Sequence, residues 1–213
     1  MAERGRFITL EGGEGAGKST QARRLAAGLR AAGLPVLETR EPGGSPGAEE
    51  IRRLLTTGEA GRWSPMAEVL LHTAARADHL RRAIRPALVE GRWVVCDRFA
   101  DSTMAYQGYG HGLDRAFIAR LTGAVLDGLE PALTLILDLP VEQGLARAAR
   151  RPGGEDRYER MDRRFHEALR QGYLAIAAAA PARCVVIDAA CPEDAVWDQV
   201  RAAVRSRLAI ELC

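Results

Sequence analysis

The sequence predicts an α/β fold in which a five-stranded parallel sheet is covered by helices on both faces. Short apolar runs alternate with longer stretches of helical periodicity, which is the pattern of repeated strand–helix units. Two of the apolar runs are hydrophobic almost throughout, as is typical of parallel strands that are buried on both sides. A glycine-rich phosphate-binding motif also lies between the first expected strand and the first expected helix.

The five expected strands are spread along the whole chain. Residues 93–97 and 133–138 are the two continuous apolar runs, and each ends in an aspartate. Residues 6–10 form a strand that runs into the glycine-rich motif, residues 35–39 form the second strand and residues 184–188 the last. The carboxyl ends of these strands should meet at one edge of the sheet, which is where ligands bind in such folds.

Helices are expected between the strands and after the last of them. Residues 21–32 are amphipathic and follow the motif directly. Ser64 and Pro65 provide a cap and a proline in the first turn, so they begin a helix that should kink or restart at Pro86. Further helices are expected at residues 48–55, 114–127, 159–180 and 193–208, and from Pro140 onwards.

A single domain is expected to occupy residues 1–213, with a mobile lid at about 148–158. The length is sufficient for one domain with a sizeable core. No internal repeat or low-complexity linker divides the chain. Within the lid, Pro152, Gly153 and Gly154 prevent regular structure.

Composition and charge narrow the classes of function. A net charge of +2 argues against a protein that coats a nucleic acid polymer. The four cysteines have no C-x-x-C spacing, which favours reduced thiols. The first residues lack a signal-like pattern, and no apolar run reaches about 18 residues. We therefore expect a cytoplasmic protein whose partners include neither a membrane nor a nucleic acid.

The glycine-rich motif matches the P-loop pattern G-x-x-x-x-G-K-[ST] at residues 12–19. Glycines allow backbone N–H groups to surround a phosphate, and the following helix adds the positive end of its dipole. Lys18 is the only lysine among 30 basic residues, which fits a site that requires a compact charge. Lys18 should contact the β- and γ-phosphates, and Ser19 should bind Mg²⁺. The residues expected to bind ATP are Gly12, Gly13, Glu14, Gly15, Ala16, Gly17, Lys18, Ser19 and Thr20.

Asp97 and Arg98 follow the third expected strand and are candidates for catalysis. An acid at this place beside a P-loop holds Mg²⁺, directly or through water, and the alternative is an acid that only caps the next turn. Arg98 can offer a bidentate fork to a second phosphate, with Arg40 and Arg52 as further candidates. An acceptor that is already a phosphate needs no general base, so no histidine is assigned that role.

The expected lid is rich in arginine. Its Pro-Gly-Gly break is flanked by Arg147, Arg150, Arg151 and Arg157. An arginine that a closing loop brings to the γ-phosphoryl group stabilises the negative charge of phosphoryl transfer. The alternative is a solvated loop whose arginines only reflect the composition of the whole chain.

Several separated motifs together resemble those of thymidylate kinases, which transfer the γ-phosphoryl group of ATP to dTMP. The motifs are E-G-G-E-G-A-G-K-S at 11–19, T-R-E-P-G-G at 39–44, A-A-R at 74–76, D-R at 97–98 and D-S-T-M-A-Y-Q-G at 101–108. The last two are the most specific to the family. The resemblance implies a P-loop nucleoside-monophosphate-kinase-like fold, ATP and dTMP as substrates, Mg²⁺ as cofactor and a homodimer.

The resemblance also assigns residues to each part of dTMP. The implied contacts are Arg98, Arg40 and Arg52 at the phosphate, Tyr106 and Glu14 at the deoxyribose, and Arg76, Thr103 and Gln107 at the thymine. Glu14 would also lie near the metal, with Ser19 and Asp97. Family members carry the catalytic arginine either in the P-loop or in the lid. The variable P-loop positions of this chain hold no arginine, so the resemblance is to the bacterial type, with Arg151 and Arg157 as the catalytic candidates.

One residue departs from the pattern of the family. His72 stands where the family usually has a phenylalanine that stacks on thymine. An imidazole can also stack on a base, but it has less apolar area and can carry a charge near pH 6.5. His72 is therefore either a tolerated substitution or a cause of altered base choice.

Three alternative functions stay open from the sequence. One is a kinase for another deoxynucleoside monophosphate or for a deoxynucleoside, against which the arginines expected to bind an acceptor phosphate argue. Another is a nucleotide-dependent switch, although the Asn-Lys-x-Asp element of GTPases needs a second lysine. The third is a nucleotide-binding protein without catalysis, which the intact P-loop and Asp97 disfavour.

Overall fold

A computed structural model describes residues 5–59, 61–150 and 157–212 of the chain. Within these ranges, five parallel strands form one sheet in the order β2-β3-β1-β4-β5. The strands are β1 (Phe7–Glu11), β2 (Val36–Arg40), β3 (Trp93–Asp97), β4 (Leu133–Asp138) and β5 (Cys184–Asp188). The predicted fold is confirmed, and every strand lies within one residue of its expected position.

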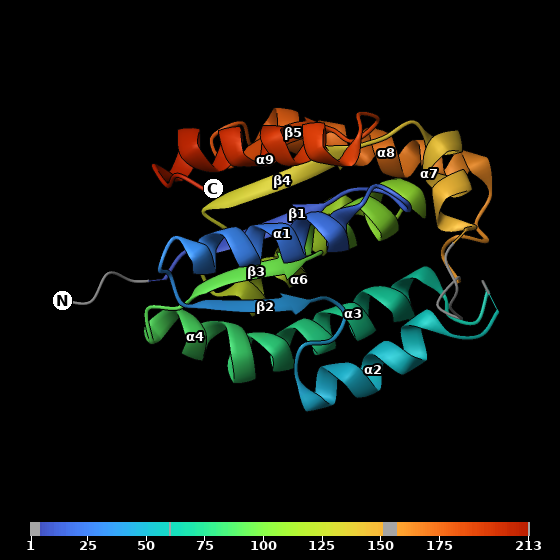
Figure 1. The fold of residues 1–213 in the computed structure, drawn as a ribbon. Coiled ribbons are helices and arrows are strands. Elements are labelled where there is room, and N and C mark those ends of the chain that lie inside the picture. The colour runs from blue at the N-terminus through green and yellow to red at the C-terminus, as the bar shows by residue number, and fades with distance from the viewer. Residues whose placement is uncertain (1–4, 60, 151–156, 213) are drawn as a thin grey trace.

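One face of the sheet is covered by α1 (Lys18–Ala31) and α9 (Glu193–Leu208), which lie side by side in Figure 1. Alternate residues of the strands point to this face because side chains alternate along a strand. Ile8 of β1 and Val95 of β3 thus share one apolar cluster with Leu25 of α1. This layer places the amino end of α1 directly after β1.

The opposite face is covered by helices from three parts of the chain. Towards β5 lie α8 (Arg163–Ala179), α5 (Ala100–Thr103) and η2 (Met104–Gly110), a π-helical segment. Towards β2 lies the end of a long helical run that packs on Phe7, Val94 and Cys96. The helices α5 and η2 were not predicted, because only the D-S-T-M-A-Y-Q-G motif marked that segment.

The helix expected to break at Pro86 is a continuous helical run with a local change of pitch. It comprises α3 (Pro65–His79), the π-helical η1 (Leu80–Ile84) and α4 (Arg85–Val89). Ser64 caps it, since its side chain accepts a hydrogen bond from the N–H of Ala67 at 3.2 Å. The expected discontinuity thus takes the form of a π-helical segment just before Pro86, which has no N–H to donate.

The remaining helices are α2 (Pro46–Thr56), which packs on α3, α6 (Arg115–Leu126) and α7 (Val141–Ala148). The helix expected from residue 159 begins instead at Arg163, because Asp162 caps it by accepting from the N–H of Phe165 at 2.7 Å. Most of the expected lid, residues 151–156, lies outside the described residues. In the described parts of the chain, no helix is both long enough and apolar enough to cross a membrane.

Candidate active site

The P-loop joins the end of β1 to the start of α1. Gly17 caps α1 in the left-handed conformation, with φ 88°, and as a glycine it has no side chain that could accept from the first N–H groups of the helix. Gly15 also has a positive φ, and a Cβ there would lie 2.0 Å from the carbonyl oxygen of Gly144 in α7. Glycine is therefore required at both positions, and the N–H groups at the amino end of α1 form a site for an anion.

Lys18, Ser19 and Asp97 meet at the carboxyl ends of β1 and β3. The Nζ of Lys18 donates to the carbonyl oxygen of Gly13 at 2.6 Å. The hydroxyl of Ser19 donates to Oδ2 of Asp97 at 2.5 Å, while the other oxygen, Oδ1, is buried without a partner among the described residues. A hydroxyl beside a carboxylate with an oxygen to spare is a donor set that suits Mg²⁺.

A cavity of about 270 Å³ extends from the P-loop to the helices on the far side of β3. The predicted substrate residues that line it are Glu14, Arg40, Arg52, His72, Arg76, Arg98, Thr103, Tyr106 and Gln107. Lys18, Ser19 and Asp97 line its P-loop end. The structure thus brings together every predicted substrate residue and three of the five predicted catalytic residues, namely Lys18, Asp97 and Arg98.

Arg98 lies at the centre of the cavity wall. Its guanidinium donates to Oε2 of Glu14 at 2.9 Å and to the carbonyl oxygen of Gly12 at 3.0 Å. It also lies 5.0 Å from the ring centroid of Tyr106, whose hydroxyl donates to the same Glu14 carboxylate. Burial opposes ionisation of Glu14, but the charges of Arg98 and Lys18 outweigh it and lower its pKa to about 2. The carboxylate is therefore ionised and anchored between two predicted substrate residues.

Arg40 and Arg52 lie at the more open side of the cavity. Arg40 is half exposed and pairs with Glu49 at 3.2 Å. Arg52 donates to the carbonyl oxygen of Pro42 at 2.7 Å. Both guanidinium groups are close enough to the cavity to serve a phosphate that enters it.

Arg76 is fully buried at the opposite end of the cavity. Its Nε donates to Oε2 of Glu41 at 2.8 Å, and its Nη2 donates to Oγ1 of Thr103 at 3.0 Å and to the carbonyl oxygen of Phe99 at 3.1 Å. The remaining nitrogen, Nη1, is buried and has no partner among the described residues. Arg76 therefore has a fixed orientation and one donor group left for a ligand.

His72 is half-buried, and its Nε2 lies 3.1 Å from the hydroxyl of Tyr158. Burial, together with the charge of Arg76, lowers the pKa of His72 to about 3. The imidazole is therefore neutral at physiological pH, and the charge considered from the sequence does not form there.

The low pKa of His72 should make the protein less stable in mild acid. The unfolded imidazole binds a proton near pH 6.5 and the folded one only near pH 3, so the free energy of unfolding falls as the pH drops below 6.5. His72→Phe removes this linkage. We expect the melting temperature of the wild type to fall more than that of His72→Phe between pH 7 and about pH 5. A difference in melting temperature that does not change with pH would contradict the assignment.

Arg157, predicted to be catalytic, is buried outside the cavity lining. Its Nη2 forms an ion pair with Glu68 of α3, and both side chains are almost fully enclosed. Its other nitrogens donate to the carbonyl oxygens of Leu55 at 3.2 Å and Glu59 at 3.1 Å. In this arrangement Arg157 fixes the chain after the lid to α2 and α3. Arg151, the other predicted catalytic arginine, lies outside the described residues.

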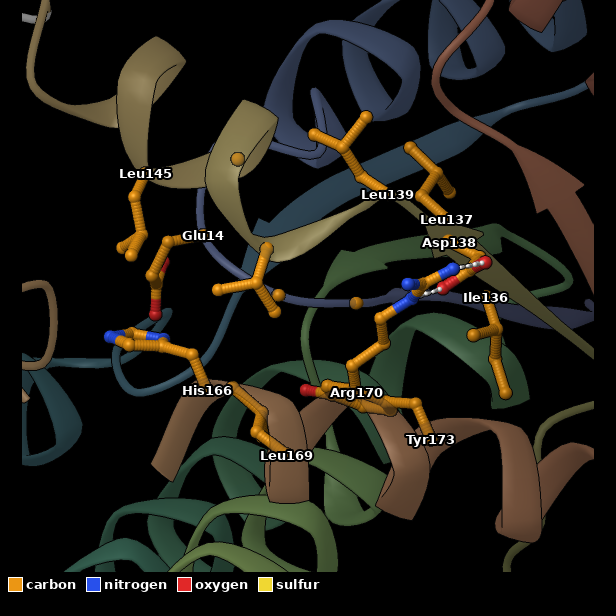
Figure 2. A pocket seen from close by; sticks show the side chains of 14 residues that line it. Glu14, Ile136, Leu137, Asp138, Leu139, Leu145, His166, Leu169, Arg170 and Tyr173 are labelled. Atoms are coloured by element: carbon orange, nitrogen blue, oxygen red, sulfur yellow. Dashed lines mark hydrogen bonds and ion pairs between the residues drawn. The ribbon is translucent and has the colours of Figure 1, made fainter. Parts of the chain in front are cut away.

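A second, much smaller cavity of about 20 Å³ lies behind the P-loop, between β4 and α8 (Figure 2). Its size is that of about one water molecule. Asp138 lines it and pairs with Arg170 through two hydrogen bonds of 2.7 and 2.8 Å. Figure 2 also shows His166 beside Glu14. Asp138, which was expected to face the ligand cleft from its strand end, therefore stabilises the contact between β4 and α8.

Sequence reasoning missed the buried acids that hold the cavity residues in place. Glu68, His72, Arg76 and His79 recur every three or four residues along α3, so they share one face of the helix. This polar stripe was readable in the sequence, because a helix face that packs on the protein interior is normally apolar. Its partners, such as Glu41, come from distant loops and could not be inferred from spacing.

Comparisons with known proteins agree with the site. The family model described as thymidylate kinase matches residues 10–200. A thymidylate kinase of Caulobacter vibrioides is 59% identical over 206 residues, which cover 97% of this chain and 99% of that protein. A second, from Dinoroseobacter shibae, is 56% identical and covers 91% of this chain and 93% of its own. The crystal structure of thymidylate kinase from Ehrlichia chaffeensis matches with a TM-score of 0.75 at 33% identity, over 94% of this chain and 99% of that one. The chain belongs to the thymidylate kinase family.

Proposed function

We propose that this enzyme transfers the γ-phosphoryl group of ATP to the phosphate of dTMP, giving dTDP and ADP. The observation that carries the proposal is a cavity lined both by the P-loop residues Lys18 and Ser19 and by Arg76 and Gln107, with Arg98 also in its lining. A nucleoside monophosphate that lies in this cavity with its base at the Arg76 end has its phosphate near Arg98 and Lys18. We also propose that the reaction takes place in the cytoplasm, where both nucleotides are available.

We assign separate sets of cavity and P-loop residues to ATP and to dTMP. In the proposal, the N–H groups of the P-loop and Lys18 hold the phosphates of ATP. Arg98, with Arg40 and Arg52, holds the acceptor phosphate, and Tyr106 and Glu14 meet the deoxyribose. Arg76, Thr103 and Gln107 meet the base, to which Arg76 offers its unpartnered Nη1.

Mg²⁺ fits the P-loop end of the site. Ser19 and Asp97 would hold it, directly or through water, because the hydroxyl and the unpartnered Oδ1 of Asp97 are oxygen ligands of the kind Mg²⁺ prefers. Glu14 lies farther along the same wall, where it is bound to Arg98. When bound, the ion would neutralise charge on the transferred phosphoryl group.

The chemistry requires positioning and charge more than proton transfer. A phosphate acceptor is already an anion, so Arg98 serves by orienting it towards the γ-phosphoryl group. Lys18 stabilises the charge that develops on the phosphoryl oxygens. We propose Arg151 as the lid arginine that completes this set, since Arg157 is bound to Glu68. In this view residues 1–213 form one kinase domain with its lid at about 148–158.

The enzyme is proposed to act as a homodimer whose interface includes α3 and α6. Met66 and Leu70 of α3 are 41% and 51% exposed, although α3 also packs on α6. Two large apolar side chains on one exposed helix face are typical of a surface that another copy covers. We expect Leu70→Asp to be monomeric in sedimentation velocity under conditions where the wild type is a dimer. A dimeric variant would place the interface elsewhere.

The proposed reaction is tested by measuring ADP production from ATP and Mg²⁺ with a panel of acceptors. The panel contains dTMP, dUMP, dCMP, dGMP, AMP and thymidine. A clear preference for dTMP supports the proposal. A preference for another monophosphate would move the acceptor assignment to that nucleotide, and thymidine turnover would argue against the role of Arg98. An enzyme that binds ATP but is silent with every acceptor would favour a protein without catalysis.

A further inference from the structure

Glu68 is a buried carboxylate at the base end of the cavity, and the roles described above leave it without a function. The side chain of Glu68 is 1% exposed. Its carboxylate accepts a hydrogen bond from Nε2 of Gln107 at 2.9 Å and from the hydroxyl of Tyr158 at 3.3 Å, and it pairs with Arg157. His111 approaches the same carboxylate at 3.6 Å. Every neighbour named here can donate a proton or carry a positive charge.

Glu68 is ionised in this environment. Burial opposes its charge, but the nearby His111 and the hydrogen bonds from Gln107 and Arg157 outweigh the effect and lower its pKa to about 2. An ionised carboxylate can only accept hydrogen bonds. The amide of Gln107 must therefore turn its NH₂ group towards Glu68, as the hydrogen bond from Nε2 shows.

This orientation decides which atom of Gln107 remains for a ligand. Gln107 lines the cavity, and its Oε1 is buried without a partner among the described residues. An amide oxygen is only an acceptor, whereas the unpartnered Nη1 of Arg76 is only a donor. The base end thus offers one acceptor and one donor, each fixed by a buried carboxylate, Glu68 for Gln107 and Glu41 for Arg76.

We propose that Glu68 is a positioning residue that determines which groups at the base end of the cavity donate hydrogen bonds to the base and which accept them. This inference rests on the proposed function. An imide edge presents an N–H next to a carbonyl oxygen and complements an acceptor beside a donor. The edge of cytosine presents the reverse, a ring nitrogen acceptor next to an amino group. Glu68 discriminates between the two by preventing the rotation of the Gln107 amide that would offer cytosine a donor.

Arg157 supports this role of Glu68 by keeping its carboxylate ionised. Without a positive partner, a carboxylate as deeply buried as Glu68 would take up a proton and could then donate a hydrogen bond. The ion pair with Arg157 keeps the carboxylate ionised and hence acceptor-only. Arg157 thereby supports the base end of the cavity.

The test compares two substitutions that change Glu68 in different ways. Glu68→Gln keeps the shape but creates a group that can donate or accept, and Glu68→Asp shortens the side chain but keeps an acceptor-only carboxylate. The measurement is the ratio of the dissociation constants of dCMP and dTMP, determined by titration calorimetry. Glu68→Gln should lower this ratio about tenfold or more, since an unmatched buried polar group is what rejects the wrong ligand. Glu68→Asp should keep the ratio within about threefold.

Stability is controlled separately, because Glu68→Gln leaves the charge of Arg157 buried without its partner. The same comparison is therefore made in an Arg157→Met background, in which neither charge remains. Glu90→Gln is the matched control, since Glu90 lies on an exposed turn and pairs with Arg92 at 3.8 Å. The affinity ratio is also insensitive to the fraction of folded protein, which affects both ligands equally.

If the ratio of dissociation constants for Glu68→Gln equals that of the wild type in both backgrounds, the inference is overturned. It is also overturned if Glu68→Asp lowers this ratio as much as Glu68→Gln does. These outcomes differ from failure of the proposed function. If the wild type does not phosphorylate dTMP in the acceptor panel, the proposed function falls and the inference falls with it. If dTMP is phosphorylated and the ratio does not respond to Glu68→Gln, the inference alone is wrong.

Discussion

Replacing Lys18 by methionine should lower kcat by on the order of 10³-fold or more while leaving the fold intact. Lys18 is the one compact cation of the P-loop, and its Nζ already lies at the mouth of the phosphate site, 2.6 Å from the carbonyl oxygen of Gly13. Methionine preserves the length and apolar contacts of the side chain but cannot stabilise charge on the phosphoryl oxygens. Turnover is measured as ADP production at saturating ATP and dTMP, and the fold by circular dichroism and thermal melting.

The matched control is Arg30→Met, which removes a cation from the last turn of the same helix. Arg30 is exposed and pairs with Glu38 at 3.7 Å, an interaction of the kind that contributes little at a protein surface. We expect its turnover to match that of the wild type. Near-normal turnover in Lys18→Met would mean that the P-loop does not hold the transferred phosphoryl group.

Arg157→Ala should be a stability variant, with a loss of about 3–5 kcal/mol in the free energy of unfolding. The substitution encloses the Glu68 carboxyl group without the Arg157 cation, so that it either stays charged at a cost or takes up a proton. It also removes the donors to the carbonyl groups of Leu55 and Glu59. For a chain of this size, such a loss corresponds to a fall of about 6–20 °C in melting temperature. Thermal melting followed by circular dichroism measures it directly.

The control for Arg157→Ala is Arg163→Ala, which breaks an ion pair with Glu142 in which both side chains are mostly exposed. That pair should be worth no more than about 1 kcal/mol. Arg151→Ala is the functional counterpart, since its melting temperature should not change while kcat falls. If Arg157→Ala instead melts like the wild type and loses kcat, the catalytic role predicted for Arg157 from the sequence is restored.

The parts of the molecule that local chemistry determines were predictable from the sequence. The P-loop pattern, the apolar runs of β3 and β4, and Asp97 at the end of β3 each depend on neighbours within a few residues. The cavity itself also follows, because the carboxyl ends of parallel strands converge on one edge of the sheet. These features needed no knowledge of how distant segments pack.

The contacts that the sequence did not predict join segments far apart in the chain. Nothing near Arg157 indicates that Glu68 is its partner, because the pair forms only when the chain after the lid packs on α3. The catalytic role of Arg157 was therefore predicted only from the chemistry of an arginine beside a glycine-rich loop. Asp138 was likewise expected to face the ligand cleft because it ends a strand, and its ion pair with Arg170 of α8 could not be inferred from the sequence. The start of α8 differed for a local reason, the cap at Asp162.

The position of Lys18 has a practical consequence for chemical labelling. The chain has a single lysine side chain, which is 7% exposed and is bound to the backbone of the P-loop. An acylating reagent that reaches a lysine of this protein therefore reaches the nucleotide site, and each modified side chain adds one mass increment to the intact protein. Peptide mass mapping separates Lys18 from the α-amino group, which such a reagent also modifies, and can thus measure the fraction of molecules acylated at Lys18, with bound nucleotide seen as protection.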